Sequence, residues 1–312
     1  MYFGSVRFFK NLILLAVCIA ILLPSVLAYK YHRGLVDTQA AAVTASHTAE
    51  AAKAELQRLE NEQAEAAARA EAEPASEPVS ADPPSYQALF PDFYAPEPYG
   101  AVERVENVIY LTFDDGPSER TDEILDVLAE KDVKATFFVI GQDDEENLQR
   151  MRRIVAEGHT IGMHSYSHDY PTVYASIEGF LEEFYKNFTQ IREATGVTPT
   201  AFRFPGGSIN GYDGAFYQEL IGEMIRRGFV PYDWNISSED AVGARSSADT
   251  LADNVVRGAS GKVRGFVLFH DSETKTTTPE ALGMVIDRLR DMGYSFAPIS
   301  PSTLPVLYNY ET

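Results

Sequence analysis

Two pairs of polar residues have the types and spacing needed for metal-assisted hydrolysis. Asp114 and Asp115 are adjacent in front of a Gly-Pro pair, and His164 and His168 are four residues apart. Adjacent side chains of an extended chain point to opposite sides, so one carboxylate can bind a metal ion while the other faces a reacting atom. With Asp115 as a third ligand, the two imidazoles make the donor set of a catalytic Zn²⁺ site or a similar divalent site. The alternative for the aspartate pair is a solvated turn, because Asp-Gly-Pro is common turn chemistry.

Two further polar side chains end apolar runs. Arg203 ends a short apolar segment in front of Phe204-Pro205, and His270 ends the run 265–270. A lone arginine is usually a surface residue, and a lone buried histidine is usually a core residue with satisfied hydrogen bonds. Their places at the ends of predicted strands instead favour a shared site, with Arg203 as the partner of a carboxylate. His159 lacks such company, and we interpret it as structural.

The elements that must position these residues begin at about residue 104, where β-branched and aromatic runs alternate with amphipathic stretches. We expect strands at 108–113, 135–140, 160–164, 201–204, 229–234, 266–270 and 295–298, and helices at 120–131, 147–157, 177–195, 215–227, 248–260 and 279–292. Strict alternation predicts a parallel sheet with helical crossovers, either open or closed into a small, distorted barrel. The carboxyl ends of such strands carry the functional site, and the polar residues fall at these ends.

The composition excludes several functions. Acidic residues outnumber basic ones 46 to 26, which gives a formal net charge of −20. This charge argues against a nucleic-acid partner, because affinity for a phosphate backbone comes largely from lysine and arginine. Cys18 is the only cysteine of the chain, so neither an intrachain disulfide nor a cysteine-based zinc site can form. No feature of the sequence indicates an obligate protein partner.

The first third of the chain has a different character. Residues 1–34 read as a signal or anchor segment, because Arg7 and Lys10 precede a weakly polar run from Leu12 to Ala28. The pattern favours an uncleaved membrane anchor over cleavage after Ala28, and both place the rest of the chain outside the cytoplasm. Residues 35–103 read as an Ala/Glu-rich helical stalk and a proline-rich linker. We expect residues 40–98 to stay apart from the catalytic domain at 104–312, because they carry few large apolar side chains.

The motifs occur in the order of a known family. Residues 112–117, Thr-Phe-Asp-Asp-Gly-Pro, resemble the first motif of the polysaccharide deacetylases, the NodB-homology carbohydrate esterases of family 4. The resemblance continues through residues 135–141, 164–168, 203–207 and 268–270, and it spans about residues 108–300. It implies an α/β fold, a distorted (β/α)7 barrel, and metal-dependent removal of acetyl groups from N-acetylated sugars.

The resemblance also assigns roles to the residues that match the family motifs. Asp115, His164 and His168 match the metal ligands, with Zn²⁺ as the expected ion and Co²⁺ or another divalent ion as alternatives. Asp114 matches the general base. With a metal-activated water, this set would supply the nucleophile for hydrolysis of an amide.

The later motifs match the remaining parts of such a site. His270 matches the general acid, Asp240 the aspartate paired with it, and Arg203 the arginine that orients the base. Leu268 matches the apolar residue that lines the pocket for the acetyl methyl group. A backbone N–H near Gly206 can help to hold the oxyanion.

Two departures from the family pattern leave the substrate open. Gly206 stands where the family usually has tyrosine, and Ala241 stands where tryptophan commonly follows Asp240; Trp234 is a candidate to fill that space. The extracytoplasmic placement favours an acetylated polysaccharide substrate in peptidoglycan, at N-acetylglucosamine or N-acetylmuramic acid residues. The alternatives are a deacetylase or esterase of chitin oligosaccharides, xylan or exopolysaccharide, and a non-catalytic glycan-binding protein of the cell envelope.

Overall fold

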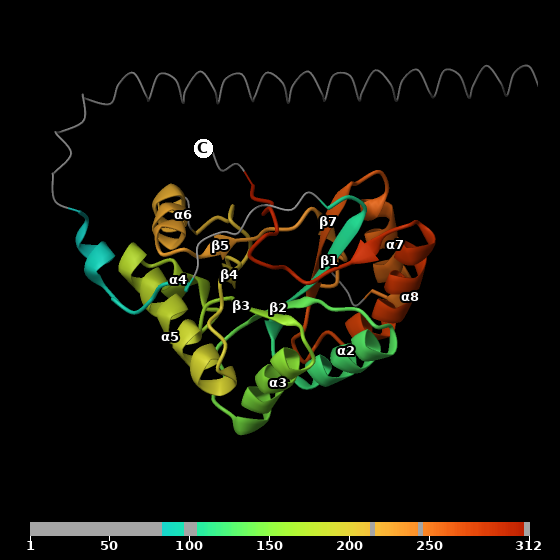
Figure 1. The fold of residues 1–312 in the computed structure, drawn as a ribbon, viewed down its shortest axis with the longest axis horizontal. Coiled ribbons are helices and arrows are strands. Elements are labelled where there is room, and N and C mark those ends of the chain that lie inside the picture. Colours follow the sequence, from blue (N-terminus) through green and yellow to red (C-terminus); the bar gives the residue numbers. More distant parts are fainter. Residues whose placement is uncertain (1–82, 97–104, 213–215, 243–245, 309–312) are drawn as a thin grey trace, which may run out of the picture. The chain divides into compact units, whose positions relative to one another are not determined.

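The computed structural model describes residues 83–96, 105–212, 216–242 and 246–308, and these form one parallel sheet covered by helices (Figure 1). The strand order is β5-β4-β3-β2-β1-β7-β6, with β8 beside β1, and every pair is parallel. The strands are β1 (Val108–Gly116), β2 (Thr136–Val139), β3 (Thr160–Met163), β4 (Ala201–Phe202), β5 (Val230–Pro231), β6 (Ile236–Ser237), β7 (Arg264–His270) and β8 (Ser295–Phe296). The sheet is a half-barrel, which fits the expected distorted barrel.

Helices connect the strands and cover the outer side of the sheet (Figure 1). They are η1 (Ser85–Ala88), α2 (Glu119–Glu130), α3 (Glu145–Ala156), α4 (Tyr170–Val173), α5 (Ile177–Thr195), α6 (Tyr217–Arg226), α7 (Ala248–Ala259) and α8 (Thr277–Asp291). Helix α7 packs against α8, α8 against α2, α2 against α3, and α3 against α5. Such crossovers are the connections that parallel strands require.

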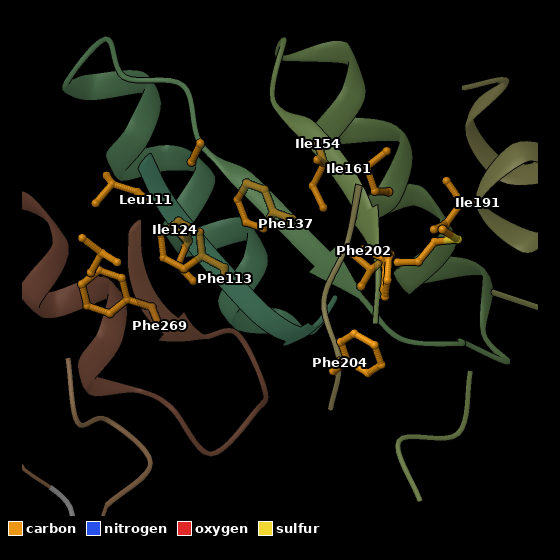
Figure 2. Packing of buried hydrophobic residues seen from close by; sticks show 14 of the residues in the cluster. Leu111, Phe113, Ile124, Phe137, Ile154, Ile161, Ile191, Phe202, Phe204 and Phe269 are labelled. Carbon is orange, nitrogen blue, oxygen red and sulfur yellow. The ribbon is translucent and has the colours of Figure 1, made fainter. Parts of the chain in front are cut away.

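The alternation of side chains along β1 separates two clusters of buried residues. Ile109, Leu111 and Phe113 lie in the larger cluster, with side chains of the helices (Figure 2). Val108 and Tyr110 point to the other face of the sheet, where a smaller cluster includes Phe138, Tyr232 and Phe266. Because the side-chain period of a strand is two, Thr112 and Asp114 continue this second face toward the carboxyl end of β1. The hydrophobic pattern therefore directs Asp114 to the inside of the sheet.

The predicted alternation of strands and helices is confirmed, with three short elements added, η1, α4 and β6. Strand β6 was not expected, because the predicted strand 229–234 ends at Pro231 and the chain pairs again from Ile236. Asn235 makes this second pairing possible, since its side chain accepts from Phe266 N–H and donates to the Arg264 carbonyl. Helix α4 was also not expected; Asp169 caps it by accepting from Thr172 N–H.

The segment 83–96 packs into the domain, so the expectation that residues 40–98 stay apart from it is wrong for these residues. Phe93 is fully buried, and its ring contacts those of Tyr185, Phe188 and Phe229. The buried guanidinium of Arg227 donates to four backbone carbonyls of the segment, those of Tyr86, Leu89, Phe90 and Phe93. A few aromatic side chains and one arginine therefore attach this segment to the domain, although it contains no long apolar run.

The predicted anchor at 1–34 and most of the predicted stalk lie outside the described residues. Within residues 83–96, 105–212, 216–242 and 246–308, no helix has the length and apolar character to cross a bilayer. The described residues belong to one compact unit.

Candidate active site

The candidate catalytic residues gather at the carboxyl ends of the parallel strands. Asp114 lies near the end of β1 and pairs in register with His270, the last residue of β7. His164 directly follows β3, and Arg203 directly follows β4. Asp240 lies in the loop after β6. Strands far apart in sequence thus bring these five side chains to one rim, as the sequence predicted.

A bulge in β1 turns both adjacent aspartates toward the same cavity. The register with β2 shifts between Asp114 and Gly116, and Asp115 has a positive φ of 71°. Simple strand alternation would place the two carboxylates on opposite faces, and that expectation is wrong here. His164 Nε2 lies 3.7 Å from Asp114 Oδ2 and 3.4 Å from Asp115 Oδ1. Bulges beside active sites re-aim side chains in this way.

Asp115, His164 and His168 form a group whose ligand atoms lie within 4.8 Å of one another. His168 Nε2 is 3.1 Å from the same Asp115 oxygen that faces His164. His164 Nδ1 lies 2.9 Å from the Arg203 carbonyl, which fixes Nδ1 as the donor and leaves Nε2 as the free ligand atom. Glu183 holds the loop between the two histidines by accepting from Ser167 N–H and Oγ–H.

The protonation states suit a divalent cation. Burial by itself would raise the pKa of Asp115, but the hydrogen bond and charge of His164, with His168 and His270, hold that pKa well below its usual range. Burial, reinforced by His164, lowers the pKa of His168. The group combines one carboxylate with two imidazoles, a donor set that fits Zn²⁺ and similar ions. Asp115 and His168 keep about a quarter of their side-chain surface exposed, so one side of the group is open.

Arg203 holds Asp114 in a fixed position beside this group. The fully buried guanidinium donates to Asp114 Oδ1 over 2.7 Å, and the same nitrogen donates to Thr112 Oγ1. Its other nitrogen atoms donate to the carbonyls of Tyr232 and Asp233, so the arginine has a single orientation. The second oxygen of Asp114 remains directed at His164.

His270 and Asp240 form a second buried pair across the cavity. His270 Nδ1 lies 2.7 Å from Asp240 Oδ1, and His270 N–H donates to Asp240 Oδ2 over 2.7 Å. Burial alone would lower the pKa of His270, but the Asp240 carboxylate, aided by Asp115 and Asp114, raises it above the ordinary value. The opposite charge of His270 and its hydrogen bonds outweigh burial at Asp240 and lower the pKa of that carboxyl. The carboxylate therefore favours the protonated form of His270.

A cavity of about 240 Å³ joins these groups. It is lined by Asp114, Asp115, His164, His168, Tyr170, Gly206, Trp234, Ala241, Leu268, His270 and Lys275. The lining includes the three residues predicted to contact substrate, Gly206, Leu268 and Trp234. Tyr170 and Lys275 were missed, because neither stands at a predicted strand end. The only available signal was that Tyr170 follows His168 by two residues.

Asp233 is a buried carboxylate that the sequence analysis did not identify as part of the site. Its carboxylate accepts from the N–H and hydroxyl of Ser208 and from the N–H of Tyr308. It thereby ties the loop after β4 to the C-terminal segment beside Trp234. The donors lower the pKa of Asp233, but burial is the larger effect and the net change is upward.

Other candidate groups take no part in this site. A larger hollow of about 540 Å³ lies between α2 and α3, but its arginines, Arg150 and Arg153, pair with Asp122. The residues that line this hollow include no histidine, cysteine or serine that could act as a nucleophile or as an acid–base group. His159 is a core residue, as predicted: its Nδ1 accepts from Ala135 N–H, and burial lowers its pKa to about 4.

Comparisons with known proteins agree with this geometry. The family model described as polysaccharide deacetylase matches residues 101–220. A peptidoglycan-N-acetylglucosamine deacetylase of Bacillus cereus is 34% identical over 206 residues, which are 65% of this chain and 72% of that protein. The catalytic domain of a peptidoglycan N-acetylglucosamine deacetylase from Eubacterium rectale has a TM-score of 0.64 at 32% identity, covering 68% of this chain and 97% of that domain.

The family also includes at least one pseudoenzyme. The crystal structure of a family 4 carbohydrate esterase pseudoenzyme from Bacillus anthracis has a TM-score of 0.53 at 27% identity, and the match covers 62% of this chain and 64% of that one. The chain therefore belongs to the polysaccharide deacetylase family, carbohydrate esterase family 4, whose active deacetylases are metal-dependent hydrolases that act on amide bonds.

Proposed function

We propose that this protein removes acetyl groups from N-acetylglucosamine residues of peptidoglycan, using a divalent ion held by Asp115, His164 and His168. The observation that carries the proposal is the placement of Asp114 and His270 on one cavity, each held by a buried side chain of opposite type, Arg203 for Asp114 and Asp240 for His270. The similar deacetylases named above support the choice of substrate. Zn²⁺ is the proposed ion, because the donor set combines two imidazoles with one carboxylate.

The two pairs divide the proton transfers of amide hydrolysis between them. When bound, the ion would activate a water molecule and polarise the acetyl carbonyl. Asp114 is the base, which accepts the proton of the attacking water at the oxygen that Arg203 leaves free. His270 donates its Nε2 proton to the leaving nitrogen, since Nδ1 is engaged by Asp240. The C–N bond breaks, the nitrogen leaves as an amine, and the acetyl group leaves as acetate.

The remaining lining residues position the acetyl group and the sugar. Leu268 lies on the inner wall of the cavity, in register with Thr112 of β1, and offers an apolar contact for the methyl group. Trp234 forms a further part of the lining. Pockets of this kind combine apolar walls with a few fixed polar groups.

A purely glycan-binding role is the less economical explanation. Binding a sugar would not require a histidine–carboxylate pair opposite a second fixed carboxylate. Burying such charges is costly unless their partners are in place, and here each charge has its partner. The complete set favours catalysis over binding alone.

We also propose that the protein works outside the cytoplasm, held at the cell surface by residues 1–34. The support is the basic and then weakly polar pattern of that segment. If the segment is instead cleaved after Ala28, the same domain would be released.

Acetate release from a panel of glycans tests the function. The full-length protein, loaded with Zn²⁺, is incubated with peptidoglycan, chitin oligosaccharides, acetylated xylan and an acetylated exopolysaccharide. We expect the highest kcat/KM on peptidoglycan, and a rate about 10²–10⁴ lower for the Asp114→Asn protein. Preference for another glycan would replace the proposed substrate, and release from none of them would remove the proposed activity.

A further inference from the structure

Two aromatic rings flank a pair of glycines at the mouth of the candidate active site. An ideal Cβ at Gly206 would lie 2.9 Å from both Cε1 and the hydroxyl oxygen of Tyr170. On the other side, a Cβ at Gly207 would lie 3.0 Å from Cη2 of Trp234. Both glycines have positive φ, of 80° and 86°, which side chains other than glycine rarely adopt. The glycine pair thus gives two rings of other segments access to the cavity, since both Tyr170 and Trp234 line it.

Tyr170 is held rigidly on its side. It is the first residue of α4, whose cap Asp169 accepts from the N–H and the hydroxyl of Thr172. Its ring packs edge-on against the His168 ring, with centroids 5.5 Å apart and an interplanar angle of 87°.

Tyr212 extends this aromatic surface outward. Its ring centroid lies 5.2 Å from that of Tyr170, and 57% of the residue surface is exposed. The loop that carries it is ordered by Asn210, whose side chain donates to the carbonyls of Pro205 and Gly207 and accepts from Tyr212 N–H. The exposed face of the Tyr212 ring is therefore accessible to a ligand beside the catalytic cavity.

The size of the cavity indicates what that ligand is. At about 240 Å³ it is smaller than the roughly 300–1,000 Å³ of pockets that enclose drug-sized ligands. Further units of a glycan must therefore lie outside it, along the rim. A pyranose ring presents C–H groups on its faces, and these pack on the negative face of an aromatic ring.

We propose that Tyr170 and Tyr212 form a stacking subsite for the sugar unit next to the one that is deacetylated, so that the enzyme selects linear glycans of at least two sugars. This rests on the proposed deacetylase function and concerns the same site. Tyr170 and Tyr212 are specificity-determining residues, whereas the reacting groups remain those described above.

The test compares a short and a long substrate. Acetate release by the full-length, Zn²⁺-loaded protein is measured on N-acetylglucosamine and on its β-1,4-linked tetrasaccharide, for the parent, Tyr212→Ala and Tyr170→Leu. We expect each substitution to raise KM for the tetrasaccharide, with a loss in kcat/KM of about tenfold, the upper range for one aromatic contact. Turnover of the monosaccharide by Tyr212→Ala should equal that of the parent.

Matched variants separate stacking from general damage. Tyr212→Phe and Tyr170→Phe keep the rings and should retain the parent's tetrasaccharide KM. Ile209→Ala removes an exposed apolar side chain, 49% exposed, from the same loop and should change neither substrate. Equal losses for Tyr212→Ala on both substrates, or none on the tetrasaccharide, would overturn the subsite.

A binding measurement gives a second readout without turnover. Trp234 is the only tryptophan of the chain, and it lines the cavity, so its fluorescence reports occupancy. In an Asp114→Asn background, Tyr212→Ala should weaken tetrasaccharide binding about tenfold. If the parent protein releases acetate from no acetylated sugar, the proposed function is wrong. If it releases acetate but its kcat/KM is the same for the monosaccharide and the tetrasaccharide, only the subsite is wrong.

Discussion

Replacing Asp240 with asparagine tests the assignment of His270 as the leaving-group acid. Asparagine has nearly the same shape, but only its carbonyl oxygen can accept, whereas in the parent His270 Nδ1 and His270 N–H each lie 2.7 Å from a different carboxylate oxygen. The substitution therefore removes the negative charge and one of the two acceptors. The pKa of His270, now raised by that charge, should fall below its ordinary value because burial is no longer opposed.

The magnitude follows from the distance and the burial of the pair. An opposite charge in direct contact changes a pKa by about 1–3 units, and each unit corresponds to about 1.4 kcal/mol. The acid acts in its protonated form, so activity is lost as the pH rises through the pKa of His270. A lower pKa therefore moves the high-pH limb of kcat/KM toward acid by at least about one unit. Above that limb, amide hydrolysis should fall tenfold or more.

The assay is the pH profile of kcat/KM on an acetylated sugar amide and on an activated aryl acetate. The amide needs a proton on its leaving nitrogen, whereas an aryloxide leaves without one, so Asp240→Asn and His270→Ala should impair the amide far more. Thr278→Val is the control, since it removes a neutral hydrogen bond to Asp240 and leaves the charge. An unmoved high-pH limb, or equal losses on both substrates for His270→Ala, would refute the reasoning and leave His270 with a role in substrate positioning.

Three further predictions concern the metal, the base and the N-terminal segment. His168→Ala should lower the metal content after dialysis, measured by elemental analysis; full retention would exclude His168 as a ligand. Asp114→Asn should keep the metal and lose about 10²–10⁴ in kcat, so near-parent turnover would contradict its role. Deleting residues 1–82 should leave the urea midpoint of unfolding unchanged. Phe93→Ala should lower the free energy of unfolding by about 3–5 kcal/mol, because its ring is fully buried. An unchanged urea midpoint for Phe93→Ala would show that the ring does not stabilise the domain.

The sequence was informative where a periodic pattern controls the structure. Buried runs separated by amphipathic stretches are enough to predict parallel strands and crossovers, and the polar residues that end the runs must meet at one rim. Asp114 and His270 are the clearest case, because they prove to be partners in register. Elements of two to four residues, such as β6 and α4, carry too little pattern to be found this way.

What the sequence did not reveal depends on contacts between distant segments. The direction of Asp115 follows from a bulge with a positive φ, which no alternation rule contains. The sequence shows that Gly206 has no side chain. It does not show that the ring of Tyr170, at the start of α4, occupies the space beside this glycine. In the same way, the packing of residues 83–96 requires the buried side chain of Arg227, far along the chain.

The attachment of residues 83–96 also determines where a mechanical load enters the domain. Tension applied to the chain before residue 83 would be borne first by the hydrogen bonds of Arg227 and the buried ring of Phe93. Arg227 lies at the end of α6, whereas the two aspartates of the rim lie on β1. If residues 1–34 hold the protein at the cell surface, a force on a bound polymer substrate would act on the attachment of residues 83–96 first. The strand that carries the catalytic carboxylates would bear that force only after this attachment had broken.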